Sequence, residues 1–167
     1  MKKRKHLHKN IFILFMVIVA SILLYAYLKS QYFLMKTISS KGYVEMKVSE
    51  IILVGEEAVI KLKNRCFEFS FYTSSHQAQS IDLGISHQIP FRPTTHDITK
   101  SILDRYGIKP IIVKITKMEE DTYFAELTLQ KGFSYMTIDI RPSDAVALAV
   151  RTKTPIYVNE SLATRIC

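Results

Sequence analysis

The chain has 167 residues and a formal net charge of +8, a size that suits one domain of ordinary dimensions. The positive charge is concentrated at one end: residues 1–41 contain eight basic side chains and no acidic one, whereas residues 42–167 contain fifteen of each sign. Because residues 42–167 carry no net charge, the surface of this domain as a whole does not attract polyanions. Any phosphate-binding function must therefore rest on a local site.

Residues 11–28 are an uncharged, almost entirely apolar run. As a helix this run covers roughly 27 Å, close to the hydrocarbon thickness of a bilayer, and it predicts a transmembrane helix. We expect a basic cytoplasmic tail at 1–10, a stalk at 29–42 and a domain at 43–167 that lies outside the cytoplasm. The reason is that the positively charged flank of a transmembrane helix stays on the cytoplasmic side. A cleaved secretory signal and a buried core helix are the alternatives.

From residue 43 the pattern alternates between strand and helix periods. Strands are predicted at 44–54, 58–63, 66–72, 110–117, 122–130, 133–140 and 155–158, and helices at 74–85, 94–106 and 142–152, with a final helical turn. Ile98, Ile102 and Tyr106 recur at helical spacing in the second helix. Two β-β-β-α units therefore follow one another, and their mostly antiparallel strands predict an α+β fold.

The sequence contains two cysteines, Cys66 and Cys167. Two are too few for a disulfide framework or a metal site, so we interpret them as incidental thiols, with a pairing or regulatory role as the alternative.

The start of the helix at 142–152 gathers groups that can bind an anion. Pro142 suits the first helical position, and Asp144 falls in the first turn, where a carboxylate meets the positive end of the helix dipole. Arg141 and Ser143 lie beside unpaired backbone N–H groups, with Asp139 on the preceding strand. In the alternative interpretation Asp144 only stabilises its helix, and Arg141 only pairs with Asp139 or Asp144.

A second group of candidate residues precedes the helix at 94–106. Thr94 and Asp97 have the spacing of a capping box, which leaves His96 unexplained. His96 is a candidate general base or phosphate contact, although an ordinary surface or core histidine is the competing interpretation. Glu126 is a further carboxylate that could bind a metal. The sequence has no glycine-rich phosphate loop, nucleophile elbow or zinc spacing.

Four segments together resemble the bifunctional nuclease domain family. They are IDIRPSDAVALAVR at 138–151, PIYV at 155–158, RPTTHD at 92–97 and YFAEL at 123–127, and the resemblance covers about 46–160. The resemblance implies two β-rich repeats that form a barrel-like sheet, a chain that is often a homo-oligomer, and cleavage of both RNA and DNA in some members.

Two hypotheses follow. In the first, the chain is a membrane-anchored nuclease-like protein acting on RNA or DNA, and each candidate residue has a role. The catalytic residues are His96, Asp139 and Asp144; the substrate-binding residues are Arg92, Arg141 and Ser143; and Mg²⁺ or Mn²⁺ is held by Asp139, Asp144 and Glu126. In the second, the chain is a non-catalytic binding or assembly module whose charged cluster is structural.

Overall fold

A computed structural model describes residues 2–38, 41–88 and 90–167. The chain divides into two compact units, Met1–Thr37 and Ile38–Cys167. The first unit is helix α1 (Lys2–Ile38), so helix extends through most of the predicted stalk. Within α1, Asn10–Tyr32 has a mean hydropathy of 2.7 and is long and apolar enough to cross a membrane. A signal sequence has the same length and composition, so these properties alone do not separate an anchor from a signal.

The second unit follows the predicted order of elements with one addition, the short strand β8. Its elements are β1 (Tyr43–Val54), β2 (Glu57–Lys63), β3 (Phe67–Ser74), α2 (Ser75–Ile85), α3 (Thr95–Arg105), β4 (Lys109–Glu119), β5 (Thr122–Lys131), β6 (Ser134–Ile140), α4 (Pro142–Thr152), β7 (Ile156–Asn159), a 3-10 turn (Glu160–Leu162) and β8 (Thr164–Arg165). The fold is therefore mixed α+β, as the sequence predicts.

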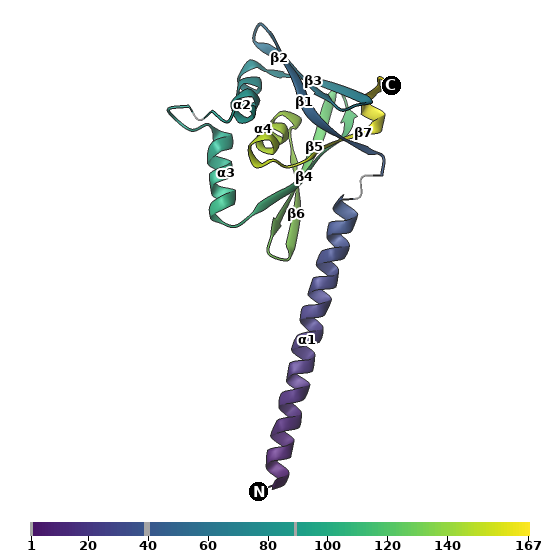
Figure 1. Ribbon diagram of the computed structural model, residues 1–167, viewed down its shortest axis with the longest axis vertical. Helices are drawn as coiled ribbons and strands as arrows, with labels where there is room; N and C mark the ends of the chain where they lie inside the picture. The colour runs from purple at the N-terminus through teal and green to yellow at the C-terminus, as the bar shows by residue number, and fades with distance from the viewer. Residues whose placement is uncertain (1, 39–40, 89) are drawn as a thin grey trace. The chain divides into compact units, whose positions relative to one another are not determined.

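The strands form one eight-stranded sheet in the order β6-β5-β4-β7-β1-β2-β3-β8 (Figure 1). Among the described strands only β4 and β7 pair in parallel. β6 and β8 lie at opposite ends of this order, so the sheet is open, and the expected barrel-like closure is not supported.

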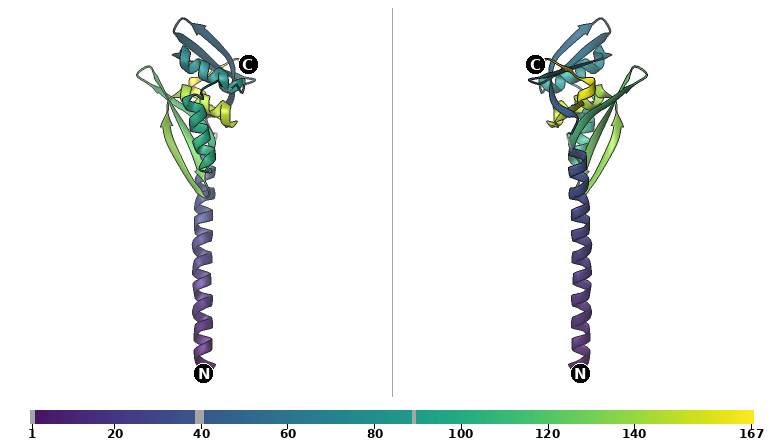
Figure 2. Two further views of the ribbon diagram at one scale, coloured as in Figure 1. Left: turned by 90° about the vertical axis from the view of Figure 1, so that its left-hand side faces the viewer. Right: turned by 90° about the vertical axis from the view of Figure 1, so that its right-hand side faces the viewer.

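Strand β1 joins the two halves of the sheet. Its first four residues, 43–46, pair with β7, and residues 47–54 pair with β2, with a register shift between Val48 and Glu50. A strand that changes partners and carries an irregularity bends, which adds to the ordinary twist of a sheet. The side views show the blue β1–β2 hairpin and the green β4–β6 strands running in different directions (Figure 2).

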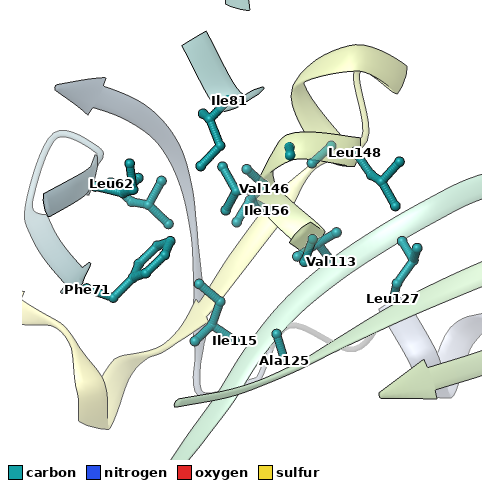
Figure 3. Close-up of a cluster of buried hydrophobic side chains, with 14 of the residues drawn as sticks. Leu62, Phe71, Ile81, Val113, Ile115, Ala125, Leu127, Val146, Leu148 and Ile156 are labelled. Atoms are coloured by element: carbon teal, nitrogen blue, oxygen red, sulfur yellow. The ribbon is translucent and has the colours of Figure 1, made fainter. Parts of the chain in front are cut away.

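The core lies between this sheet and helices α2 and α4 (Figure 3). Ile60 and Leu62 of β2, Val113 of β4 and Leu127 of β5 are at most 1% exposed and belong to the same cluster as Val146 of α4. Seven of the eleven α4 residues are buried, so this helix is covered on more than one side. A helix this deeply buried holds its N-terminus, and the polar groups there, in a fixed position.

Helices α2 and α4 approach closely at Gly84. A Cβ atom on Gly84 would lie 2.5 Å from Cγ2 of Val150 and 2.7 Å from NH1 of Arg151. Distances this short leave no room for a side chain, so glycine is required for the contact. The contact brings α2 against the guanidinium of Arg151.

Helix α3 forms at the predicted position, but its apolar stripe is not its packed face. Ile98, Ile102 and Tyr106 are 49%, 51% and 62% exposed, whereas Leu103 is buried. His96 and Asp97 of α3 contact α2 and α4 through polar groups, which hydrophobic periodicity cannot reveal.

The interpretation of the cysteines as incidental thiols is wrong: Cys66 and Cys167 form a disulfide, with their Cα atoms 4.9 Å apart. The two-residue strand β8 pairs with β3 beside this bond, and Ile166 N donates to Cys66 O at 2.8 Å. The two cysteines are 101 residues apart in the sequence, so sequence spacing gave no sign of their pairing. The disulfide links the end of the chain to the third strand.

We expect the double variant Cys66→Ser/Cys167→Ser to lower the free energy of unfolding by about 2–4 kcal/mol, because the unfolded chain loses a large closed loop. Urea denaturation of the full chain in mild detergent measures this loss. A reducing agent should destabilise the wild type by a similar amount and leave the double variant unchanged. A wild-type stability that is insensitive to reduction would contradict the disulfide.

Candidate functional site

Eight polar side chains meet where helices α2, α3 and α4 pack together, and we call this set the polar network. Its members are Gln77, Ser80, Thr94, His96, Asp97, Arg141, Asp144 and Arg151. All but Arg151 lie on the first turn or two of a helix or at its N-cap, so the network forms where three helix starts converge.

Arg151 lies at the centre of the polar network and its side chain is only 4% exposed. Its Nε donates to Oδ1 of Asp97 at 2.7 Å, and its NH1 donates to the carbonyl oxygens of Ser80 at 2.7 Å and Ala147 at 2.9 Å. A buried guanidinium is tolerated only when its charge is paired and its N–H groups are bonded. Arg151 therefore binds α2, α3 and α4 to one another.

Asp97 serves two purposes. It completes the predicted capping box, since Asp97 Oδ2 accepts from Thr94 N at 2.9 Å, and it pairs with Arg151. Burial acts to raise the pKa of Asp97, but the hydrogen bonds from Arg151 and Thr94, with the charge of Arg151, lower it below the usual 3.8. Asp97 is thus an ionised partner for the buried guanidinium.

Both ring nitrogens of His96 have partners. Nδ1 lies 2.9 Å from Ser80 Oγ, and Nε2 lies 3.3 Å from Oδ1 of Asp144. Arg151 NH2 donates to Ser80 Oγ at 3.3 Å, so the Ser80 hydroxyl is best placed to donate to Nδ1, which leaves the proton of a neutral ring on Nε2. Burial lowers the pKa of His96 below 6.5, with Arg151 acting in the same direction against the opposing effect of Asp144. The ring is neutral at pH 7.

Arg141 is the exposed cation of the polar network, with 71% of its side chain accessible. Its Nε donates to Oδ2 of Asp144 at 2.6 Å, and its NH2 and NH1 donate to the amide oxygen of Gln77 at 3.0 and 3.1 Å, in the amide orientation that the partners require. A guanidinium has five N–H groups, so two remain without a partner among the described residues. Those two can bind a phosphate from solvent.

The structure gathers three of the predicted site residues, Arg141, Asp144 and His96. Ser143 lies next to them but is 5% exposed. Its hydroxyl oxygen lies 3.3 Å from the amide nitrogen of Gln77 and accepts a hydrogen bond from it, which holds the Gln77 side chain in place. Arg92 is exposed on the loop before α3.

Glu126 and Asp139 lie elsewhere. They face each other across β5 and β6, and Glu126 also faces Lys114 of β4. Ala125 and Leu127 point into the core, so Glu126 between them points to the sheet face away from α4. The described residues include no group of three or more His, Cys, Asp or Glu side chains placed to hold a metal ion.

Sequence reasoning missed Gln77, Ser80 and Arg151. Gln77 and Ser80 lie on a polar helix with no motif of its own, and only contacts between helices give them a role. Arg151 was visible as the last residue of the 138–151 motif, but nothing in the sequence marked its side chain as buried. Asp97 was explained by capping alone.

A cavity of about 300 Å³ opens between α2 and α3 beside the polar network. Its lining includes Gln77, Gln79 and Ser80 of α2 and Thr95 and His96 of α3. His96 therefore lines a space that a small molecule or part of a polymer can enter, and Arg141 adjoins that space through its partner Gln77.

The fold and the site define an α+β domain in which a buried arginine positions a histidine, a carboxylate and an exposed arginine beside a cavity. The family model of the bifunctional nuclease domain matches residues 59–166, and the chain belongs to this family. The match includes every member of the polar network, and it confirms the resemblance identified from the sequence.

Similar proteins occur in plants and in a bacterium. Bifunctional nuclease 1 of Arabidopsis thaliana is 41% identical over 75 residues, and bifunctional nuclease 2 of Oryza sativa subsp. japonica is 43% identical over 75; each alignment covers 43% of this chain and 23% of the relative. An uncharacterised protein of Mycobacterium tuberculosis is 36% identical over 73 residues, which cover 44% of this chain and 43% of that protein. The similarity thus spans about a quarter of the plant proteins.

Replacing Arg151 by Met should lower the free energy of unfolding by about 3–5 kcal/mol, because it leaves the Asp97 carboxylate and two carbonyl oxygens without their buried donor. Lys100→Met is the matched control: it breaks the exposed Lys100–Asp104 pair and should cost less than about 1 kcal/mol. Urea denaturation in mild detergent measures both. Equal, small losses in the two variants would show that Arg151 does not bind the helices together.

The lowered pKa of His96 predicts a pH dependence of stability. As the pH falls below 6.5, the unfolded chain takes up a proton at His96 before the folded chain does, so stability declines from that point down through the folded-state pKa. Asp97 contributes a further loss only below 3.8. Denaturation midpoints between pH 8 and pH 5 should fall for the wild type and fall less for His96→Asn. Identical slopes for the two proteins would contradict the assignment.

Proposed function

We propose that the chain is a membrane-anchored, nuclease-like protein that hydrolyses phosphodiester bonds of RNA or DNA. The observation that carries the proposal is the match to the bifunctional nuclease domain over a region that contains the whole polar network. The plant relatives, which are named bifunctional nucleases, agree with it. A local site is also what a domain of neutral charge requires for binding a polyanion.

Arg141 is the proposed phosphate-binding residue. Its side chain is 71% exposed, so its two remaining N–H groups are accessible to a substrate from solvent, and its bonds to Asp144 and Gln77 hold the guanidinium in place. Arg92 on the neighbouring loop is the proposed second contact with the nucleic acid.

His96 is the proposed proton carrier. Its neutral ring carries its proton on Nε2, towards Asp144, so Nδ1 can take up, through the Ser80 hydroxyl, the proton that an attacking water loses and return it to the leaving oxygen. The lowered pKa keeps the ring able to accept a proton at neutral pH. Asp144 orients the ring and stabilises its charged form. Asp139, which the sequence predicted to be catalytic, lies on the other face of the sheet. We therefore assign it no role in the proposed mechanism.

The predicted Mg²⁺ or Mn²⁺ stays a prediction. Asp139 and Glu126 do not meet Asp144, and both carboxylate oxygens of Asp144 already accept hydrogen bonds. The three predicted ligands therefore do not fit one ion in this arrangement, and no step of the proposed mechanism is routed through a metal.

Membrane anchoring by α1, with the domain on the outer side, is part of the proposal. The apolar span and its basic N-terminal flank support it. The disulfide supports it independently, because such bonds persist in oxidising compartments and are rare in the cytosol. The homo-oligomer implied by the resemblance stays a prediction.

A binding or assembly module is the second candidate function, and one observation favours it. Both nitrogens of His96 and both oxygens of Asp144 are engaged by protein partners, as a purely structural network requires. In that case Asp144→Asn lowers stability and no activity is lost with it.

The proposal predicts that the full chain in detergent cuts RNA or single-stranded DNA. Arg141→Ala should lower kcat/KM on the order of a hundredfold, because a charged contact to the reacting phosphate is lost. Fluorescent oligonucleotides with and without Mg²⁺, Mn²⁺ and a chelator provide the assay. Arg65→Ala removes another exposed arginine, one outside the polar network, and should leave the rate unchanged.

Folding of each variant is checked through its thermal midpoint. If the wild type cleaves nothing under any of the metal conditions, the nuclease proposal is wrong and the binding or assembly module is the remaining candidate function. Equal losses in Arg141→Ala and Arg65→Ala would show that cleavage occurs elsewhere.

A further inference from the structure

The cavity between α2 and α3 differs in charge from the arginine beside it. Its lining, which lies entirely within the described residues, contains no Lys, Arg, Asp or Glu side chain. Its lining residues are His76, Gln77, Gln79, Ser80 and Leu83 of α2, the N-cap Thr94, and Thr95 and His96 of α3. Such a lining, polar but without a permanently charged side chain, suits an uncharged, flat group with several hydrogen-bonding atoms on its edge.

The cavity and the exposed arginine share Gln77. Gln77 lines the cavity, and its amide oxygen accepts the two bonds from Arg141, so the cationic group lies one residue away from a pocket without a permanently charged side chain. A ligand that fits both has an uncharged heterocycle joined to an anion over a short distance. A nucleotide has this chemistry.

We propose that the α2–α3 cavity is a nucleobase subsite and that Arg141 holds the phosphate attached to that base; the inference rests on the proposed function and names its substrate class. The Gln77 amide is already bonded to Arg141, Ser143 and Thr73, so Gln79 is the amide left to pair with a base edge through two hydrogen bonds. The rings of His76 and His96 offer stacking surfaces. A volume of about 300 Å³ is at the small end of ligand pockets and suits one base.

The subsite selects for unpaired nucleotides. In a duplex the base edges are paired and the faces are stacked, so a base enters the cavity only from a single strand, a loop or a flipped-out position. The preferred substrate is therefore single-stranded RNA or DNA, cut beside the base that occupies the cavity.

Calorimetric titration of the full chain in detergent tests the subsite without relying on activity. The probes are adenosine 5′-monophosphate, cytidine 5′-monophosphate, ribose 5-phosphate and inorganic phosphate. We expect at least one nucleotide to bind ten times more tightly than ribose 5-phosphate. Gln79→Ala should weaken nucleotide binding at least fivefold and leave ribose 5-phosphate unchanged, whereas Arg141→Ala should weaken both.

Gln88→Ala is the matched control, because Gln88 is an exposed glutamine that lines a neighbouring cavity and not this one. It should leave every affinity unchanged. Equal affinities for nucleotide and ribose 5-phosphate, no nucleotide binding at millimolar concentration, or an unaltered nucleotide affinity in Gln79→Ala would each overturn the subsite.

A cleavage arm separates this inference from the proposed function. Nucleotide binding with the expected variant pattern but no cleavage would refute the nuclease and support the subsite. Cleavage of single-stranded and duplex RNA at equal rates would refute the subsite and support the nuclease.

Discussion

The arrangement of the domain around its site depends on one buried cation. Moving a guanidinium out of water costs several kcal/mol unless its charge and N–H groups are matched. Arg151 meets this condition through one carboxylate on α3, one carbonyl oxygen on α2 and one on its own helix. Because these partners come from three helices, the helices cannot separate without leaving a buried charge unpaired. Gly84 allows the approach that the contact needs.

The polar network includes one arginine from each end of helix α4, and the two lie in opposite environments. Arg151, at the C-terminal end of α4, is 4% exposed and has a structural role, whereas Arg141, at the N-cap of the same helix, is 71% exposed. His96 and Asp144 connect the two regions, so the position of the exposed guanidinium follows from the packing of the buried one. A domain without net charge can in this way present a single oriented cation to a polyanion.

Much of the fold could be predicted from the sequence, because it is set by local patterns. Alternation located the strands of both repeats, Pro142 fixed the start of α4, and the Thr94–Asp97 capping box fixed the start of α3. The open edge of the sheet and strand β8 could not be predicted, since they depend on pairing between distant segments and on the Cys66–Cys167 bond.

The site was predictable in part for the same reason. Asp144 and Arg141 are three residues apart on one helix, and their pairing was one of the sequence interpretations. The contacts of His96 with Asp144 and Ser80 join separate helices, and no periodicity encodes them. Glu126 and Asp139 matched the chemistry of metal ligands, but the alternation of side chains along β5 turns them away from α4.

A crystal structure of the chain with a bound, non-cleavable phosphorothioate dinucleotide would test the central claim most directly. Our account predicts the phosphorus within hydrogen-bonding reach of the Arg141 guanidinium, with Arg151 still buried against Asp97. A dinucleotide bound instead on the Glu126 and Asp139 face, with Arg141 unoccupied, would contradict it.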